Sequence, residues 1–473
     1  MTPDDLSQLG ARQLAALIRS GQVSALEVMD AHLARIEHWN PRVNAIIGML
    51  PPEACRALAR EADERARHRV PLGPLHGLPT AFKDLQEAVG LPFTRGSPIY
   101  RDAVGAADTI LVERIRRAGA IPIGKTNVPE FGLGSHTYNT VWGTTRNPYD
   151  LTKSAGGSSG GAGAALATGM LPIADGGDLG GSLRNPANFN NVVALRPTVG
   201  LVPTAPDPFP RLGFGVNGPM ARSADDVAFF LGVLAGADSR DPGCEPSDPA
   251  ALGAPLTGHT GHPIRLAWSL DLGGLPVEPA VRATLDGRRH TFEAIGCAVE
   301  DATPDLTGAD EVFLAVRRWR TAAVFGPLLT THRPRMKQEL VEEVELGLAM
   351  SGSDVAAALL THTALLARTA AFFERFDVLA CAVNQVAPFD AALDWPKTVA
   401  GTAMTHYIEW MQSTYWITTT FAPAVSVPAG FTDEGLPVGI QLVGRPREDR
   451  RLLELAHRFE QANPAGRRRP ALP

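Results

Sequence analysis

Hydrophobic positions recur at helical spacing near the start of the chain and gather into short apolar runs further on. Over residues 11–36, apolar side chains follow a period of three to four and Gly21 interrupts the run, which predicts two amphipathic helices. Asp108 is a suitable N-cap for a later helix that Gly119 ends, and the apolar residues 120–123 after it predict a strand. Helices that alternate with short apolar strands indicate an α/β fold.

Strand-like runs return in the second half of the chain. Residues 243–262, rich in Pro, Gly and Thr, predict an exposed connection, and helical patterns fill most of the interval from there to about residue 376. The sequence therefore predicts one sheet to which both halves of the chain contribute. The apolar runs that predict its later strands are residues 263–268, 378–383, 424–428 and 438–443.

The composition is that of an ordinary globular protein. Of the 473 residues, 44% are apolar and 20% are charged, which excludes disorder and coiled coil and provides for a large core. Lys and Arg number 44 against 50 Asp and Glu, a net charge of −6, so no basic surface for nucleic acid or an anionic membrane is expected. The expected partner is a small molecule.

Cysteine usage and the apolar stretches bear on the cellular compartment. The acidic N-terminus has none of the features of a signal peptide, and the longest apolar stretches fall short of the roughly 20 residues that span a bilayer. We therefore expect a cytoplasmic protein that does not associate with membranes. Four cysteines without a C-x-x-C pair indicate neither a disulfide framework nor a zinc site and fit a reducing compartment: Cys55, Cys244, Cys297 and Cys381.

One segment matches a nucleotide-binding pattern by letter only. Residues 119–126 satisfy G-x-x-x-x-G-K-[ST], but a phosphate loop follows a strand and opens a helix. Here a predicted helix precedes the segment, its middle reads as a strand, and Pro129 breaks any helix after it. Binding of a nucleoside triphosphate through Lys125 is the alternative from another class of protein, and this context argues against it.

A block rich in glycine and serine, residues 154–191, is where we expect the chemistry. Residues 156–161 lead into a helix of small residues, and the free N–H groups at its start point back toward Ser158 and Ser159. The consecutive glycines of residues 174–184 let backbone N–H groups converge on one point, as an oxyanion hole requires. Two ordinary glycine-rich turns are the alternative, which is weakened because two serine-bearing loops lie only 24 residues apart.

A serine nucleophile needs a base, and the histidines are poor candidates. A serine hydroxyl is weakly nucleophilic unless a base lies within hydrogen-bond reach. No histidine stands in a triad signature, so we interpret His76 and His136 as turn or surface residues. The same interpretation is preferred for His259 and His262 over a metal-binding pair, and no metal site is predicted.

A lysine is the better candidate for the base. Lys83 stands at the end of the apolar segment 75–85, where burial would make its ammonium form costly and lower its pKa. The alternative is a structural salt bridge with Asp84 or Asp178.

Taken together, these motifs resemble the amidase signature family. The resemblance covers most of the chain in order: residues 75–83, 124–127, 156–161, 178–184, 218–223 and 435–442. The spacings also look like those of the family, with Lys83 75 residues before Ser158 and Ser158 24 residues before Ser182. The resemblance implies an α/β fold with a large mixed, mostly parallel twisted β-sheet covered by helices on both faces. It implies a single domain over residues 1–473, with N-terminal helices over about 1–65 and a helical excursion over about 243–376.

The resemblance also implies a catalytic set. It assigns Ser182 as the nucleophile, Ser158 as a bridging serine held by a cis peptide bond, and Lys83 as the base. Neither a cofactor nor a metal is implied. The oxyanion hole would be formed by the backbone N–H groups of Leu179, Gly180, Gly181 and Ser182, with Asp178, Arg184, Gly157 and Ser159 in support.

Two departures from the family pattern lie beside the nucleophile. Leu179 stands where many members have a small hydroxyl residue, and Asn185 stands where an apolar residue is common. Since Leu179 would act through its backbone N–H, we expect the mechanism to survive and the shape of the acyl pocket to change.

These observations predict an amidohydrolase that works through an acyl-enzyme on Ser182. Its substrate would be a carboxylic amide such as an aryl amide, a carbamate or a cyclic oligoamide, because the candidate pocket segments 131–138, 206–214 and 407–416 are aromatic and apolar. The nearest alternative is the amidase subunit of a tRNA-dependent amidotransferase, which would need a partner chain; a catalytically silent binding protein is a further one. Homodimers are common among proteins that resemble this one, so a homodimer is expected. The residues expected to bind substrate are Phe131, Gly132, Leu133, Phe209 and Phe214.

Overall fold

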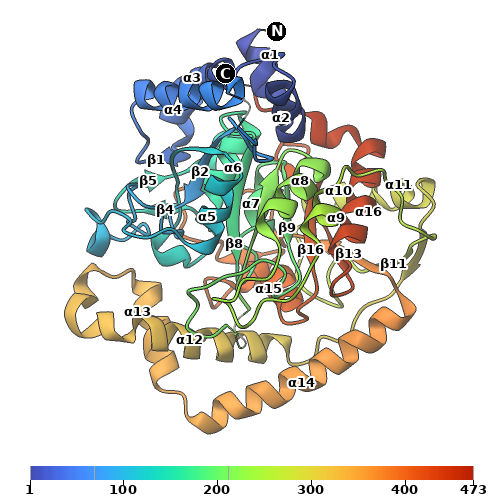
Figure 1. Cartoon of the computed structure of the whole chain (residues 1–473). Coiled ribbons are helices and arrows are strands. Elements are labelled where there is room, and N and C mark those ends of the chain that lie inside the picture. The colour runs from blue at the N-terminus through green and yellow to red at the C-terminus, as the bar shows by residue number, and fades with distance from the viewer. Residues whose placement is uncertain (1, 69, 211, 213, 472–473) are drawn as a thin grey trace.

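An eight-stranded sheet runs through the molecule (Figure 1). The computed structural model describes residues 2–68, 70–210, 212 and 214–471. The strands come from both halves of the chain, in the order β12-β11-β13-β17-β16-β9-β10-β8, so the predicted shared sheet is confirmed. They are β8 (Ile173–Asp178), β9 (Val193–Arg196), β10 (Val216–Ala221), β11 (Arg265–Trp268), β12 (Ala298–Asp301), β13 (Val378–Ala382), β16 (Ala424–Phe431) and β17 (Pro437–Gly444).

The mixed character of the sheet is confirmed, but its parallel share is smaller than expected. Two neighbouring pairs of the described sheet are parallel, β11 with β12 and β11 with β13, and the other five are antiparallel. Part of the reason is local: residues 432–436 join β16 to β17 directly, and a connection this short allows only antiparallel pairing.

Helices cover both faces of the sheet, as expected. Side chains alternate between the faces along a strand, and β17 shows both environments. Ile440 and Leu442 belong to the core that also holds residues of α8 (Ala224–Leu234) and α16 (Asp449–Ala462). Gln441, between them, accepts a hydrogen bond from Arg184, the first residue of α7 (Arg184–Phe189), on the opposite face.

The N-terminal helices have the predicted arrangement. Four helices occupy residues 3–67, and Gly21, at a φ of 71°, separates the second from the third. Ser24 and Glu27 cap the start of the third helix reciprocally, so its beginning is encoded locally. The four are α1 (Pro3–Gln8), α2 (Ala11–Arg19), α3 (Ala25–Val43) and α4 (Pro52–Arg67).

A small second sheet carries the lysine predicted to be the base. It is formed by β1 (Ile46–Ile47), β3 (Ile121–Thr126) and β2 (Pro79–Lys83), and Lys83 ends β2 as predicted. Helix α5 (Ile110–Arg117) precedes β3, and Gly119 lies between the two at a φ of 89°. The predicted N-cap was one residue early. Thr109 caps the helix, and its side chain accepts the Val112 N–H, whereas the Asp108 side chain accepts the Val89 N–H at 2.7 Å.

The predicted helical excursion over 243–376 is only partly helical, because β11 and β12 of the main sheet lie within it. The wholly helical part comprises α12 (Ala309–His332), α13 (Gln338–Leu348) and α14 (Gly352–Arg375), which run along the lower edge of Figure 1. Within the described residues, α14 is the one helix whose length and composition would suffice to cross a membrane. Leu365 and Phe373 nevertheless anchor it in a core with β13.

The remaining elements are short or frame the loops of the site. The helices are α6 (Gly160–Ala167), α9 (Pro249–Gly253), α10 (Pro279–Asp286), α11 (Arg289–Ala294) and α15 (Gln412–Thr418). The strands are β4 (Tyr138–Asn139), β5 (Gly143–Thr144), β6 (Arg146–Asn147), β7 (Asp150–Ser154), β14 (Thr398–Val399) and β15 (Thr402–Ala403). Single 3₁₀ turns lie at Pro98–Tyr100, Glu130–Gly132, Arg333–Arg335, Glu409–Met411 and Pro464–Arg467.

Candidate active site

Three separate segments bring Lys83, Ser158 and Ser182 to one cavity of about 480 Å³. Lys83 is the last residue of β2, Ser158 lies just before α6, and Ser182 lies between β8 and α7. Glycines in the elements next to these segments are required by close contacts. A Cβ on Gly161 would lie 2.3 Å from the backbone nitrogen of Asn127, and one on Gly176 would lie 2.9 Å from the Ser159 hydroxyl.

The Lys83 amine contacts three oxygen atoms and almost no solvent. Its Nζ lies 2.8 Å from the Ser158 Oγ and 2.8 Å from the Ser159 Oγ, and it donates to the Gly177 carbonyl at 3.1 Å. The side chain is 1% exposed. An uncharged amine has two N–H groups and one lone pair, so it can donate to Gly177 and Ser159 and still accept the proton of Ser158.

Burial lowers the pKa of Lys83 to about 7, and the nearby Asp175 and Asp178 carboxylates oppose this shift. Asp175 Oδ1 accepts the backbone N–H of Lys83 at 3.1 Å, and burial raises the pKa of Asp175 to about 6. A lysine with a pKa near 7 is partly uncharged at neutral pH and can act as a base.

The structure contradicts the alternative of a structural salt bridge at Lys83. Among the described residues, Lys83 has no carboxylate within 4 Å. Asp84 faces Lys125 at 3.9 Å, and the Asp178 carboxylate pairs with Arg184 and Arg196.

The loop before α6 has the cis peptide bond that was expected, between Gly157 and Ser158. The Gly157 carbonyl accepts a hydrogen bond from Ser135, and Asn185 donates to the same serine hydroxyl at 2.7 Å. Asn185, which departs from the family pattern, therefore steadies the loop that carries Ser158.

Ser182 joins this arrangement through the backbone. The N–H of Ser159 donates to the Ser182 carbonyl at 3.2 Å, which ties the two serine loops together. Ser182 is partly exposed to the cavity, and Ser158 is buried. A direct hydrogen bond between the Ser158 and Ser182 hydroxyls is not among those formed by the described residues.

Asp178 anchors the loop that carries Ser182. Its carboxylate accepts two bonds of 2.9 Å from Arg184 and one of 3.2 Å from Arg196. Burial would raise the pKa of Asp178, but these guanidinium groups and the Gly181 N–H hold it well below its ordinary value. Asp178 and Arg184, expected in support of the site, thus form one buried ion-pair network.

One of the four expected oxyanion donors is already engaged. The Gly181 N–H donates to Asp178 Oδ1 at 2.8 Å, because the loop wraps around this carboxylate. Within the described part of the chain, the N–H groups of Leu179, Gly180 and Ser182 have no hydrogen-bond acceptor, so these three can receive an oxyanion.

The expected substrate-binding residues divide into two groups. Phe131, Gly132 and Leu133 line the cavity, and Phe131 packs against Phe325 with ring centroids 4.8 Å apart. Phe209 and Phe214 do not line it, and that expectation was wrong. Phe209 packs on Trp319 with centroids 4.6 Å apart, and Phe214 is buried between Phe313 and Phe421.

Of the predicted pocket segments 206–214 and 407–416, only the first contributes residues to the cavity lining. From residues 206–214 the cavity receives Pro206, Asp207 and Pro208. From residues 407–416 it receives none, because this segment packs behind α12, where the Tyr415 hydroxyl donates to Asp310 at 2.6 Å.

The wall formed by α12 was not predicted from the sequence. The lining positions follow helical spacing, the one signal that could have indicated a common face. A stripe of this kind is equally consistent with a core contact, so the sequence could not assign it to a cavity. The lining residues of α12 are Arg317, Arg320, Thr321, Val324 and Phe325, and Leu85, Gln86, Phe93, Arg95 and Asn217 were missed elsewhere.

The nucleotide-binding alternative fails on burial. Lys125 lies within β3, is fully buried and donates to the Gln86 carbonyl, so it has no access to a phosphate. His76 lies in a turn, as one form of the prediction had it, but neither His76 nor His136 is at the surface. His76 and His136 are buried, with ring nitrogens 3.0 Å from the Ala62 carbonyl and 2.7 Å from the Ser154 hydroxyl, respectively.

The other histidine pair lies on the surface. His259 and His262 are exposed, and an Nη of Arg451 lies 2.9 Å from His262. Within the described ranges, no group of three or more His, Cys, Asp or Glu residues could hold a metal ion.

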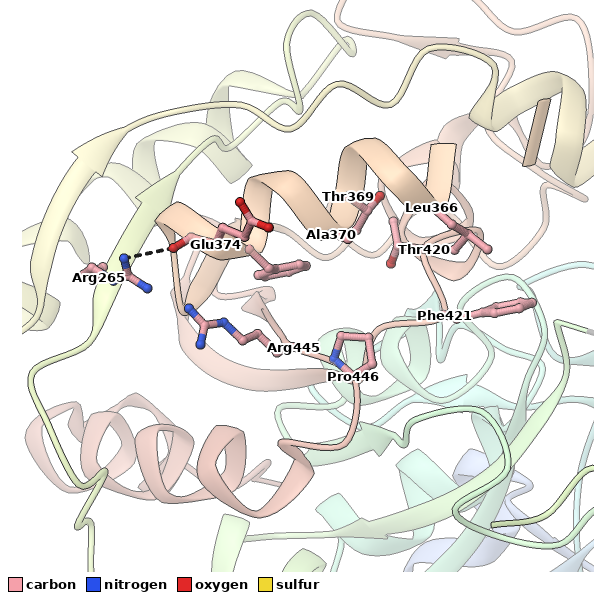
Figure 2. A pocket seen from close by; sticks show the side chains of 10 residues that line it. Arg265, Leu366, Thr369, Ala370, Glu374, Thr420, Phe421, Arg445 and Pro446 are labelled. Atoms are coloured by element: carbon pink, nitrogen blue, oxygen red, sulfur yellow. Dashed lines mark hydrogen bonds between the residues drawn. The ribbon is translucent and has the colours of Figure 1, made fainter. Parts of the chain in front are cut away.

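A larger cavity, of about 740 Å³, lies against α14 (Figure 2). Its charged side chains include Arg265, which donates to the Glu374 carbonyl at 3.1 Å, and Arg445, which pairs with Asp377 at 2.9 Å. The rest of its lining is mostly apolar and includes neither serine nor lysine. The smaller cavity is therefore the candidate active site.

Comparison with known proteins shows which family the chain belongs to. The sequence matches the family described as Amidase over residues 27–453. It is 33% identical over 480 residues to an acylamidase of Rhodococcus erythropolis, covering 100% of this chain and 99% of the relative. It is 34% identical to an indoleacetamide hydrolase of Bradyrhizobium diazoefficiens, covering 93% and 84%. It is 33% identical to a subunit of the glutamyl-tRNA(Gln) amidotransferase of Symbiobacterium thermophilum, covering 98% and 99%.

Solved structures show the same fold. A bacterial aryl acylamidase of the amidase signature enzymes superposes with a TM-score of 0.89 at 28% identity, covering 96% of both chains. A 6-aminohexanoate cyclic dimer hydrolase bound to its substrate superposes with a TM-score of 0.86 at 27% identity, covering 98% of this chain and 99% of the other. Its sequence match and its fold show that the chain belongs to the amidase signature family and is an enzyme that hydrolyses the carbon–nitrogen bond of amides.

Proposed function

We propose that this enzyme cleaves its amide through an acyl-enzyme on Ser182, with Lys83 as the base and Ser158 as the relay between them. The observation that carries the proposal is the contact of 2.8 Å between the buried Lys83 amine and the Ser158 hydroxyl. Because burial lowers the pKa of Lys83 to about 7, the amine is available as a proton acceptor at neutral pH.

The proposed reaction has two halves. The Ser182 oxygen attacks the carbonyl carbon while its proton passes to Ser158 and the Ser158 proton passes to Lys83. The carbon–nitrogen bond then breaks, the amine leaves with the proton returned from Lys83 through Ser158, and the acyl group stays on Ser182. Water attacks the ester in the same way and releases the carboxylic acid. The relay needs Ser182 to reach Ser158 when substrate is bound, and catalytic hydrogen bonds often tighten only at that stage.

For the oxyanion we propose the N–H groups of Leu179, Gly180 and Ser182. The Gly181 N–H instead donates to Asp178, and this hydrogen bond stabilises the conformation of the loop. Removing one such donor typically costs about 3–4 kcal/mol of transition-state stabilisation.

The substrate we propose is an amide with an aromatic group. Support comes from the rings of Phe93, Phe131 and Phe325 in the cavity lining and from the relatives named acylamidase and indoleacetamide hydrolase. A cavity of about 480 Å³ accommodates a small molecule of this kind.

Ser182→Ala tests the proposal. The variant should lose anilide hydrolysis and labelling by an activated aryl phosphonate, while the wild type shows both. Labelling that persists in the variant would refute Ser182 as the nucleophile. Turnover of carbamates or cyclic amides in place of anilides would keep the nucleophile and change the substrate class.

A second candidate function is that of an amidotransferase subunit, favoured by the similarity to the glutamyl-tRNA(Gln) amidotransferase subunit of Symbiobacterium thermophilum. Such a subunit would hydrolyse mainly glutamine and would purify with a partner chain. Glutaminase activity without anilide activity would favour this candidate over the first.

For the assembly we propose a homodimer in the cytoplasm that acts without a cofactor or a metal. The four cysteines are free, which fits a reducing compartment. Light scattering of the purified protein tests the dimer, and a mass of one chain would refute it.

A further inference from the structure

One of the three guanidinium groups in the cavity lining has no counter-ion. Arg317 pairs with Glu343, and Arg320 pairs with Asp207 at 2.8 Å. Over residues 2–68, 70–210, 212 and 214–471, the Arg95 side chain forms neither an ion pair nor a hydrogen bond. Its N–H donors are therefore available to a ligand.

The guanidinium of Arg95 is held in place without using its donors. Its central carbon lies 4.3 Å from the ring centroid of Phe93 and 4.9 Å from that of Tyr100, so it sits against two aromatic faces. The backbone is fixed as well, because the Arg95 carbonyl accepts the Phe131 N–H at 2.8 Å. A guanidinium positioned in this way loses little conformational entropy when it binds a ligand.

The charges around Arg95 leave this end of the cavity positive. Glu87 also lines the cavity, but its carboxylate accepts the backbone N–H of Ala106 at 2.9 Å and lies beyond ion-pair distance of Arg95. The Lys125 amine lies 5.6 Å from the Phe93 ring, but Asp84 compensates its charge at 3.9 Å, so the uncompensated positive charge here is that of Arg95 itself. The Asp178 carboxylate is compensated by two arginines.

An aromatic wall continues from Arg95 into the cavity. Tyr100 contacts Phe131 edge-to-face with centroids 6.0 Å apart, and Phe131 contacts Phe325 at 4.8 Å. A ring lying on this wall and an acceptor within reach of Arg95 would both belong to a single ligand.

We propose that Arg95 selects amides that carry a carboxylate at the end remote from the scissile bond. The carboxylate accepts two N–H bonds from the guanidinium, and the aromatic part of the substrate lies against Phe131 and Phe325. This inference rests on the proposed function, since it names the substrate class of the same site.

Matched pairs of anilides test the inference on either side of the amide bond. One pair is 4-acetamidobenzoate and 4-acetamidobenzamide, with the charge on the amine part. The other is 4-oxo-4-(phenylamino)butanoate and its carboxamide, with the charge on the acyl part. We expect the carboxylate of at least one pair to have a kcat/KM about 10- to 100-fold higher than its neutral partner, mostly through KM, as a hydrogen-bonded charged group provides.

The preference should depend on the Arg95 charge. Arg95→Gln should reduce the ratio to near one, mostly by lowering kcat/KM for the carboxylate member. Arg95→Lys should keep part of the preference. Arg101→Gln is the control, because Arg101 is an exposed arginine of the same segment and does not line the cavity. The preference should also weaken at high salt, where an accessible charge pair is screened.

Binding to the Ser182→Ala variant keeps the outcome independent of turnover. Calorimetry should give a tighter dissociation constant for the carboxylate, and this difference should vanish when Arg95→Gln is added. Equal affinity for both members of each pair, or a preference that survives Arg95→Gln, would overturn the inference. A binding preference without turnover by the wild type would leave Arg95 as the anion contact and refute the proposed anilide hydrolysis alone.

Discussion

Replacing Lys83 by methionine tests whether the protein holds this amine uncharged. Methionine keeps an unbranched side chain of similar length and removes the charge. Burial lowers the pKa of Lys83 from 10.5 to about 7. At about 1.4 kcal/mol per pH unit, the folded protein therefore disfavours the charged form by roughly 5 kcal/mol.

The sign of the effect follows from proton binding. Between pH 7 and 10.5 the unfolded chain binds a proton at Lys83 that the folded protein does not, so the free energy of unfolding rises with pH in this window. The penalty is complete below about pH 7 and disappears above pH 10.5. Between pH 8 and 9.5, the wild type should therefore gain about 1.4 kcal/mol per pH unit relative to Lys83→Met.

The measurement is urea unfolding of both proteins across this pH range. Lys83→Met also loses the contacts with Ser158, Ser159 and Gly177, so the difference at any single pH is less informative than its slope. Lys397→Met, which removes an exposed lysine, is the matched control. Two results would contradict this expectation: the free energies of unfolding of the wild type and of Lys83→Met differ by the same amount at every pH, or the wild type loses stability relative to the variant as pH rises. Either result would mean that Lys83 is charged in the folded protein. Its role as the base would then have to be abandoned.

Two further predictions concern the carboxylates beside the catalytic groups. Asp175→Asn should move the acidic limb of the kcat/KM profile, expected near pH 7, to lower pH, because the Asp175 charge raises the pKa of Lys83. Asparagine can still accept the backbone N–H of Lys83, so this contact is kept. An acidic limb that moves to higher pH in a pH–rate measurement would contradict the prediction. Arg184→Met should lower the free energy of unfolding by about 3–5 kcal/mol, because it removes one of the two counter-ions of the buried Asp178. Urea unfolding measures this change, and a loss below about 1 kcal/mol would mean that Arg196 alone suffices. Arg184→Lys should recover only part of the loss, since lysine cannot reproduce the paired bonds of the guanidinium to one carboxylate.

Local features of the sequence determined much of the fold. The helices on either side of Gly21, the helix that ends before Gly119 and the four strands β11, β13, β16 and β17 follow from hydrophobic period and turn residues, which act within a few positions of one another. The position of Lys83 at the end of an apolar strand was readable for the same reason. The motif order and spacing were enough to indicate the family and the three candidate catalytic residues.

Contacts between distant residues decided the rest. Lys83 contacts the Ser158 hydroxyl, 75 residues away, and not the adjacent Asp84. The tertiary fold places Asp84 opposite Lys125 instead. Only the folded loop shows that the Gly181 N–H donates to Asp178 and is not available to an oxyanion. The apolar face of a helix has the same period whether it meets a core or a cavity, so the packing of α12 alone decided that Arg317 and Arg320 line the site while Phe214 lies in the core.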